Sequence, residues 1–419
     1  MQERSLYNPT THILGNGIVV VIDEVPSVES AAVGFWVRAG TRDEPRGRAG
    51  IAHMVEHTSF RRTGKRSSSK IARDFENVGA YANAFTTKEE TCYYVRTLSD
   101  HMKPVLQTLA DVVINPVFDA VDVDKERLII TEEIRSYEDE AEEYIFDLGE
   151  QQLFGQHALG LPIVGTAETV QRISVDDLQQ FHNRHYHGGS IVVAASGNVN
   201  SARLLASMEQ LSVDLPARQP RRRRTSPRAL SPSSKTVEWN SQQAHVLWHT
   251  ATRGQHSSDR AALTLLNVIL GDGMSSRLNA RIRETNGMAY TIYSQVQLFL
   301  DVGMLSIYAG MDDKNIGRAQ SMIERELNKL RLEGVRPSEL KRAKEQVRAT
   351  RIMSLESLTS RMNLLGKGML DDGHPEDPFR AIDESNAVTI DEINALAGRV
   401  CDPSNWHRLL LRPTEGERR

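Results

Sequence analysis

"ISVDDLQQF", residues 173–181, has a counterpart late in the chain in "VTIDEINAL", residues 388–396. In each stretch a hydroxyl residue, Ser174 or Thr389, can cap a helix whose first turn carries acidic side chains. A hydrophobic run typical of a strand follows each one, "SIVVAASGNV" in the first case and "HRLLLRP" in the second. Because the same succession occurs twice, the sequence predicts two copies of one domain.

The stretches before these two signatures also follow one order in both halves. The first half opens with "GIVVVIDE" and "SAAVGFWVRAG", β-branched and aromatic runs that predict strands, before a helix that contains "HMVEH". The second half has the strand-like "AHVLWHTA", "AYTIYSQVQ" and "GMLSIYAG" among segments with helical apolar spacing. We therefore expect an α+β fold of two homologous domains, each a mixed, largely antiparallel β-sheet with helices packed mainly on one face.

One stretch interrupts this alternation: "LPARQPRRRRTSPRALSPSS", residues 215–234. Proline removes backbone donors and like charges repel, so the stretch predicts a linker between an N-terminal domain, residues 1–214, and a C-terminal domain, residues 235–419. A nucleic-acid contact through Arg221–Arg224 is the alternative. It lacks the interleaved aromatic side chains on which bases stack.

The bulk composition describes a soluble globular protein. The 419 residues are 39% hydrophobic and 25% charged, and the formal net charge of −4 gives no general attraction to nucleic acid or to an anionic membrane. The only cysteines, Cys92 and Cys401, form no Cys-x-x-Cys pattern, which favours a reducing compartment. No signal-like or membrane-spanning apolar run is found, so we expect a cytoplasmic protein with neither a membrane nor a nucleic-acid partner, and export by an unrecognised route is the alternative.

The pentapeptide "HMVEH", residues 53–57, predicts a metal site. On a helix, His53 and His57 lie one turn apart on the same face, and two imidazoles at this spacing can bind one divalent metal. Glu56 would stand beside a water molecule at the open coordination position and act as general base. The alternative is that these are ordinary core histidines. A second group, "FHNRHYHGG", lacks a nearby acid and is expected to be structural.

A third ligand is expected in "VDKERLIITEEIRSYEDE". Glu126 and Glu133 are seven positions apart, which is two helical turns, so they share a face from which Glu132 is rotated by about 100°. Glu133 as third ligand would complete a two-histidine, one-glutamate site with an open fourth position, and Glu126 would support a ligand or the water. The alternative is a solvated acidic helix face.

These motifs carry a family resemblance. The carriers are "GIAHMVEHTSFRRTGKRS", "FENVGAYANAFTTKEETCYY" and "DKERLIITEEIRSYED", with "LNVILGDGMSSRLNARIRETNGMAYTIYS" in the second half. The chain resembles the pitrilysin/insulinase family of zinc metallopeptidases, the inverzincins, and most closely its short two-domain members related to the mitochondrial processing peptidase. In that family the third ligand follows the last histidine of the motif by about 76 positions, and 133 − 57 = 76 selects Glu133.

The resemblance implies a role for each matching residue. It implies one zinc ion per chain on His53, His57 and Glu133, with Glu56 as general base and Glu126 as a supporting glutamate. It also implies that an edge strand, made of Asn83, Ala84, Phe85 and Thr86, pairs with the substrate backbone. Finally, it implies that Arg283 and Tyr290 contact the substrate, with Tyr290 able to donate to the oxyanion.

The implied function is that of a zinc endopeptidase that cuts peptides or unfolded protein segments inside a closed chamber. The alternative is a non-catalytic scaffold or partner-activating subunit, against which the complete set of His53, Glu56, His57 and Glu133 argues. Long family members contain four such domains and this chain has two, so we expect a homodimer. In such a dimer Arg283 and Tyr290 would act on the zinc site of the other subunit.

Overall fold

The computed structural model describes residues 7–217 and 224–414, which form two compact units built from discontinuous segments. Unit 1 comprises Met1–Ile134, Pro162–Arg224 and Ile352–Pro378, and unit 2 comprises Arg135–Leu161, Thr225–Arg351 and Phe379–Arg419. Residues 135–161, inside the expected first domain, thus lie with the second unit, and residues 352–378 lie with the first. Each unit therefore contains one segment from the other half of the chain.

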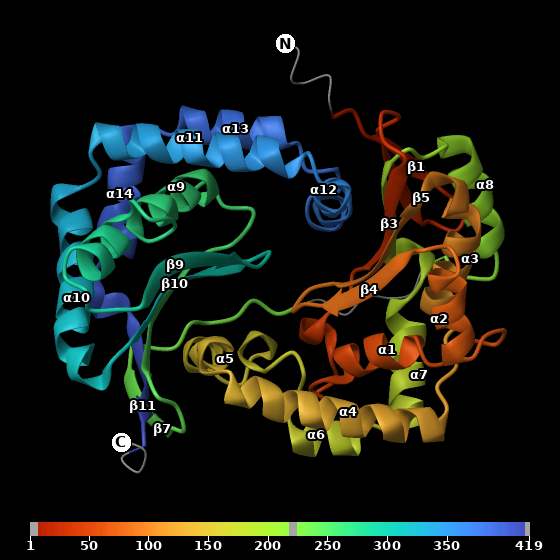
Figure 1. The fold of residues 1–419 in the computed structure, drawn as a ribbon, viewed down its shortest axis with the longest axis horizontal. Coiled ribbons are helices and arrows are strands. Elements are labelled where there is room, and N and C mark those ends of the chain that lie inside the picture. Colours follow the sequence, from red (N-terminus) through yellow and green to blue (C-terminus); the bar gives the residue numbers. More distant parts are fainter. Residues whose placement is uncertain (1–6, 218–223, 415–419) are drawn as a thin grey trace. The chain divides into compact units, whose positions relative to one another are not determined.

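The sheet of unit 1 has six strands in the order β1-β2-β6-β3-β5-β4 (Figure 1). Only β2 and β6 pair in parallel, and the other neighbours are antiparallel. The strands are β1 (Thr10–Ile13), β2 (Val19–Glu24), β3 (Ser30–Val37), β4 (Tyr81–Thr86), β5 (Thr91–Leu98) and β6 (Ile191–Gly197). The sheet is therefore mixed and largely antiparallel, as the sequence predicts.

The sheet of unit 2 repeats this topology without the first strand. Its order is β7-β11-β8-β10-β9, and again only the first two strands pair in parallel. The strands are β7 (Ser234–Trp239), β8 (Ala244–Arg253), β9 (Thr291–Leu298), β10 (Val302–Met311) and β11 (His407–Pro413). The matching strand order confirms the predicted α+β fold of two homologous domains.

The main core of unit 1 lies between one face of its sheet and a layer of helices (Figure 1). Strand β3 alternates, so that Val33, Phe35 and Val37 enter this core while Gly34 and Trp36 face the other way. The helices are α1 (Ile51–Ser59), α2 (Ser68–Glu76), α3 (Met102–Ile114), α4 (Ala120–Asp139), α6 (Ala167–Arg172), α7 (Val175–His185) and α8 (Ser201–Leu211).

The opposite face of this sheet is covered by α12 (Leu358–Asp371), which contacts β6, β3 and β2. A Cβ atom at Gly366 would lie 2.2 Å from Nε1 of Trp36, so a glycine is needed where this helix crosses the strand. Arg361 of α12 donates to Asp23 at 2.6 Å in a buried ion pair. This borrowed helix is therefore an integral part of unit 1.

Unit 2 has the same two-sided cover. Its main core lies under helices α9 (Arg260–Leu270), α10 (Ile316–Glu333), α11 (Pro337–Ser354) and α14 (Ile390–Val400), and α13 (Pro378–Ala387) precedes α14. The other sheet face packs against the borrowed helix α5 (Ala141–Phe154), where Ile145 meets Leu247 and Leu409 in a separate apolar cluster. Both helix caps expected from the sequence are present, because Ser174 accepts from the backbone of Asp177 and Thr389 from that of Glu392.

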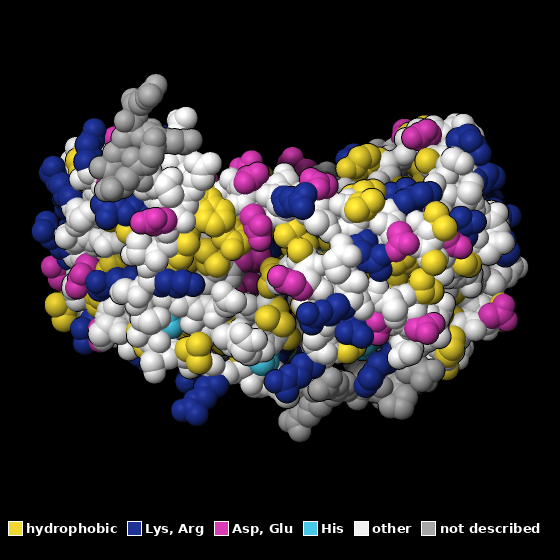
Figure 2. All heavy atoms as spheres, turned by 90° about the horizontal axis from the view of Figure 1, so that it is seen from below, with side chains coloured by type: hydrophobic (Ala, Val, Ile, Leu, Met, Phe, Trp, Pro, Cys, Tyr) yellow, Lys and Arg dark blue, Asp and Glu magenta, His cyan; other side chains and the backbone are white. Residues whose placement is uncertain are grey.

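The surface carries charges of both signs. On the face shown in Figure 2, basic side chains lie dispersed among acidic and hydrophobic ones. Within the described part of the chain, no helix is long and apolar enough to cross a membrane.

Candidate metal centre

Helix α1, which carries the motif "HMVEH", packs on the core of unit 1 through an apolar face. Ile51, Ala52, Met54 and Val55 are fully buried in the core of unit 1, which anchors the helix. His53 is also nearly buried, with 7% of its surface exposed. The remaining motif side chains are thereby turned toward α4 on one side and β4 on the other.

His53, His57 and Glu133 come together as the sequence predicts. Nε2 of His53 lies 3.7 Å from Oε1 of Glu133, and Nε2 of His57 lies 3.6 Å from Oε2 of the same carboxylate. One donor atom from each of the three residues lies within 4.8 Å of the others. The spacing of four residues puts His53 and His57 on one face of α1, and the approach of α4 brings Glu133 to the same point.

The donor set fits a zinc ion. Bonds of about 2.0–2.1 Å at tetrahedral angles separate ligand atoms by about 3.3–3.4 Å, close to the distances between the two imidazoles and Glu133. Two imidazoles and one carboxylate are also a ligand combination found in catalytic zinc sites, which keep a fourth position open. The residues present therefore match the requirements of such an ion.

The two histidines differ in their electrostatic surroundings. Burial, followed by the neighbouring charge of His57, lowers the pKa of His53 to about 3, so its imidazole is neutral at neutral pH. Burial also lowers the pKa of His57, but the hydrogen bond to Glu126 and the charges of Glu56 and Glu133 outweigh it and raise the pKa overall. A neutral His53 is ready to ligate a metal, whereas the carboxylates around His57 favour its protonated form more than those around His53 do.

Glu126 fixes the orientation of His57. Its Oε2 lies 3.0 Å from Nδ1 of His57, and its Oε1 accepts from Nε of Arg61. Burial would raise the pKa of Glu126, but these two hydrogen bonds lower it overall, so the buried carboxylate stays charged. Nδ1 of His53, by contrast, has no hydrogen-bond partner among residues 7–217 and 224–414. The sequence indicated Glu126 but not Arg61.

Glu56 stands outside the ligand set. Its Oε2 accepts a hydrogen bond of 2.5 Å from Oγ1 of Thr86, the last residue of β4. Burial raises the pKa of Glu56 although this hydrogen bond opposes it. The contact with Thr86 joins residues far apart in sequence and was not predicted.

The predicted substrate strand is an edge strand. Within the sheet of unit 1, β4 pairs with β5 only and ends the strand order. Its residues include Asn83, Ala84, Phe85 and Thr86, and the Asn83 side chain accepts a hydrogen bond from the backbone of Ala84 at 2.8 Å. On the side of β4 that faces away from β5, backbone N–H and C=O groups have no partner strand among the described residues of this sheet, and an added strand would pair with them.

Arg283 and Tyr290 belong to unit 2. Arg283 lies in a short π-helix, η6 (Asn279–Glu284), with 47% of its side chain exposed and with Glu284 as an ion-pair neighbour at 4.0 Å. Tyr290 precedes β9, is 55% exposed and donates to Oδ1 of Asp312 at 3.1 Å. This hydrogen bond raises the pKa of the tyrosine. Both side chains are accessible within their own unit.

Two other sequence features have structural explanations. His182, from the second histidine group, is buried and has Nε2 2.9 Å from the carbonyl oxygen of Val113. In the arginine run, residues 221–223 lie outside the described residues, while Arg224 makes ion pairs with Asp43 and Glu89. Arg224 is thus engaged within the protein.

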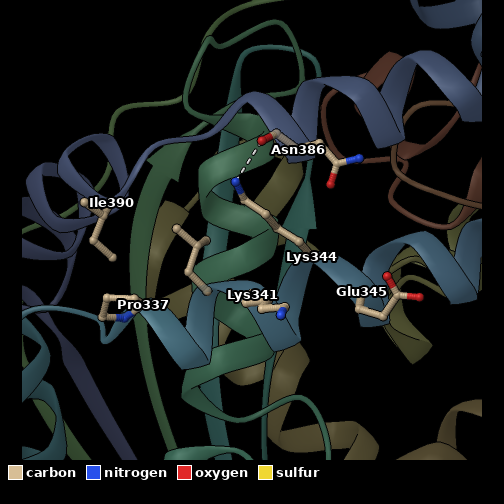
Figure 3. Close-up of a pocket in the computed structure, with 7 residues that line it drawn as sticks. Pro337, Lys341, Lys344, Glu345, Asn386 and Ile390 are labelled. Carbon is tan, nitrogen blue, oxygen red and sulfur yellow. Dashed lines mark hydrogen bonds between the residues drawn. The ribbon is translucent and has the colours of Figure 1, made fainter.

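A pocket in unit 2 contains none of the predicted site residues (Figure 3). It lies beside α11 and the turn between α13 and α14, with Pro337, Leu340, Lys341 and Ile390 in its lining. Nζ of Lys344 donates to the carbonyl oxygens of Asn386 and Val388 at 2.7 and 2.6 Å. These bonds hold the turn between α13 and α14 against α11, so Lys344 has a structural role.

Two family models match the chain. Residues 19–167 match the model described as insulinase (peptidase family M16), and residues 172–347 match the model described as peptidase M16 inactive domain. The first match contains the three potential ligands and Glu56. The second contains Arg283 and Tyr290.

Similar proteins occur in several bacteria. An uncharacterized zinc protease of Mycobacterium tuberculosis is 36% identical over 395 residues, which is 93% of this chain and 90% of the relative. The uncharacterized zinc protease YmxG of Bacillus subtilis is 33% identical over 382 residues, 91% of this chain and 93% of the relative.

Solved structures show the same fold. A peptidase M16 inactive domain from Pseudomonas fluorescens has a TM-score of 0.91 and 20% identity, covering 97% of this chain and 98% of the other. A protease from Helicobacter pylori has a TM-score of 0.89 and 20% identity, covering 97% of this chain and all of the other.

Proposed function

The chain belongs to the insulinase family of peptidases, M16, and from this premise we propose that it is a zinc-dependent endopeptidase acting on peptides or unfolded protein segments. The observation that carries the proposal is that the potential zinc ligands and the potential general base of α1 are separate residues with different partners. His53 and His57 present Nε2 to Glu133, whereas Glu56 lies apart from these ligands and is held by Thr86. A site built only to bind a metal would not need this separate carboxylate.

His53, His57 and Glu133 would hold one zinc ion per chain. The chemistry that zinc supplies when bound is Lewis acidity toward the scissile carbonyl and toward a water molecule. Glu126 would keep His57 in the tautomer whose Nε2 is free to ligate, since its carboxylate accepts a hydrogen bond from the N–H at Nδ1. Arg61 would in turn hold Glu126.

Glu56 would act as general base and then as general acid. Its carboxylate would take a proton from the attacking water and return that proton to the leaving amine. The raised pKa of the buried carboxyl suits the first step, because a more basic carboxylate accepts the proton of the attacking water more readily. The hydrogen bond from Thr86 would keep one oxygen fixed while the other reacts.

Strand β4 would bind the substrate backbone as an added strand. Such pairing recognises an extended main chain with little demand on sequence. Since Thr86 of this strand also holds Glu56, a paired substrate would lie close to the general base. The proposal includes an enclosed site, which favours flexible chains over folded ones.

The proposal assigns Arg283 and Tyr290 to the substrate and places the active enzyme in a homodimer. Their exposed side chains offer a guanidinium group for substrate carbonyls and a phenol for the oxyanion. A two-fold dimer would supply each zinc site with these residues from the partner subunit.

The alternative is a scaffold or partner-activating subunit of the same fold. The second half of the chain lacks an H-x-x-E-H pattern and matches a domain model described as inactive, but the first half has the full set. Metal analysis of the purified protein, combined with cleavage of an unstructured peptide library, tests the proposal. Stoichiometric zinc with cleavage abolished in Glu56→Gln supports it, and metal-loaded protein without cleavage supports the scaffold.

A further inference from the structure

Arg224 closes the arginine run and is bound inside unit 1. Its Nε and Nη2 donate to the two carboxylate oxygens of Asp43 at 3.1 and 2.7 Å, and its Nη1 lies 3.4 Å from Oε1 of Glu89. Nη2 also donates to the backbone carbonyl of Glu89. Only 16% of the side chain is exposed. A bidentate arginine–carboxylate pair of low exposure fixes both position and orientation.

Asp43 connects Arg224 to the start of the motif helix. It ends the short helix η2 (Thr41–Asp43), and the next residue, Glu44, accepts backbone hydrogen bonds from Gly50 and Ala52 at 3.1 and 3.0 Å. These donors lie at the N-cap and in the first turn of α1, where backbone N–H groups lack partners within the helix, so the Glu44 carboxyl supplies the acceptor that they need. The position of η2 therefore bears directly on the helix that carries Glu56.

Glu89 connects Arg224 to the strand that holds Glu56. It lies in the turn between β4 and β5, three residues after Thr86. The turn is fastened to η2, because the backbone of Arg42 donates to Lys88 at 2.8 Å and the Arg42 side chain pairs with Glu89 at 2.6 Å.

The approach between η2 and this turn is very close. A Cβ atom at Gly40 would lie 2.5–2.6 Å from backbone atoms of residues 87–89, so only glycine fits there. Small displacements of one segment must therefore be passed to the other. Arg224 is the group that bonds to both segments from outside.

We propose that Arg224 is a positioning residue of the peptidase. It joins η2 to the β4–β5 turn and so keeps Glu56 of α1 within hydrogen-bonding distance of Thr86. This inference rests on the proposed function. Loss of the guanidinium group would remove the four hydrogen bonds through which one side chain joins Asp43 to Glu89, whereas the pair between Arg42 and Glu89 would remain. A misplacement of about 1 Å at a reacting group costs up to about 100-fold in rate.

The test compares the zinc-loaded full-length variants Arg224→Ala, Arg224→Lys and Arg228→Ala. Arg228 is the matched control, because it lies on the same linker, is exposed and does not contact the site described above. We expect kcat of Arg224→Ala to fall about 10- to 100-fold at unchanged zinc content and nearly unchanged KM, while Arg228→Ala matches the wild type. Arg224→Lys should lie between them, since an ammonium group cannot bind Asp43 in the bidentate manner.

Two further measurements separate positioning from a general loss of structure. Millimolar guanidinium ion should restore part of the activity of Arg224→Ala and leave Arg228→Ala unchanged. In a double-mutant cycle, adding Asp43→Asn should cost much less in the Arg224→Ala background than in the wild type, because the two groups act through one contact.

Wild-type kcat in Arg224→Ala would overturn the inference, and so would a loss that follows zinc content and that guanidinium does not relieve. Failure of the proposed function looks different. In that case Glu56→Gln would keep its activity, or no variant including the wild type would cleave peptides. An inactive Glu56→Gln beside a fully active Arg224→Ala would leave the proposed function standing and remove only the role of Arg224.

Discussion

Oε2 of Glu126 lies 3.0 Å from Nδ1 of His57, on the ring edge opposite the nitrogen that faces Glu133. One helix, α4, therefore contacts both nitrogens of the same imidazole, with residues two turns apart. Carboxylates in this position raise the basicity of a ligating histidine and fix its orientation. Glu126 is thus expected to act on metal affinity through His57.

Glu126→Gln should weaken zinc binding by about 10- to 100-fold while the three ligands remain. The amide oxygen can accept the hydrogen bond from Nδ1 only as a neutral group, and Arg61 loses its anionic partner. Competition with a chelator of known affinity measures the change. An unchanged zinc dissociation constant would show that the contact with His57 has no bearing on the metal.

Glu56→Gln should separate metal binding from catalysis. The variant should hold as much zinc as the wild type, because Glu56 is not a ligand, but peptide cleavage should fall by about 10²- to 10⁴-fold. Metal analysis and a fluorogenic peptide assay on the same preparation provide both values. Substantial residual cleavage would contradict the role of general base.

Glu133→Gln should lose both zinc and activity, and Glu132→Gln is its matched control. The two glutamates are neighbours on α4, but only Glu133 faces the imidazoles, while Glu132 is exposed. Near-normal zinc content in Glu133→Gln, or its loss in Glu132→Gln, would show that the third ligand is assigned to the wrong residue.

Helical spacing explains why each pair of site residues could be predicted from sequence, whereas the resemblance to the insulinase family joined the two pairs into one metal site. His53 and His57 are separated by four residues and Glu126 and Glu133 by seven, so local geometry alone puts each pair on one face. The twofold pattern of strands and capped helices likewise depends on local residue preferences. The face shared by each pair and the capped helices need no knowledge of contacts between distant segments, but the meeting of Glu133 with the two histidines does.

The unpredicted features all depend on tertiary packing. No local pattern shows that α12 covers the sheet of unit 1, because Gly366 becomes meaningful only when it meets Trp36. The hydrogen bond from Thr86 to Glu56 joins a strand to a helix 30 positions away in sequence. From the sequence, Arg224 is expected to be a solvated charge on a linker. Its ion pairs with Asp43 and Glu89 appear only in the folded structure.

The buried residue His249 should make unfolding depend on pH. It has no exposed surface, and burial followed by the neighbouring charge of His407 lowers its pKa from 6.5 to about 3. Between these values the unfolded chain binds a proton that the folded chain excludes. The free energy of unfolding should therefore fall as the pH decreases through this window, by up to about 1.4 kcal/mol per pH unit for this group.

His249→Gln should reduce this slope, as urea unfolding at several pH values between about 4 and 6 can show. His101→Gln is the control, since His101 has 38% of its side chain exposed. An identical slope in wild type and His249→Gln would show that His249 does not exclude a proton in the folded state.

Peptide cleavage should depend on an extended substrate chain. Pairing with β4 requires a free main chain, so a segment in an unfolded tail should be cut much faster than the same sequence inside a stable domain. A fusion protein carrying one cleavable segment, as a tail and as an internal strand, allows the comparison by mass spectrometry. Equal cleavage of both forms would contradict substrate binding by strand addition.

The proposed dimer predicts complementation between two inactive chains. Co-expressed Glu56→Gln and Arg283→Ala subunits should form mixed dimers in about half of all cases. If Arg283 acts in trans, one site of each mixed dimer combines an intact Glu56 with an intact Arg283, and activity should recover to about 25% of the wild type. If it acts in cis, every site keeps one lesion and mixing restores nothing.

A chain with both substitutions, mixed with the wild type, is the control, because its mixed dimers should be inactive in trans and half-active in cis. Lack of recovery despite isolated mixed dimers would contradict the trans arrangement, and an active monomer would contradict the dimer.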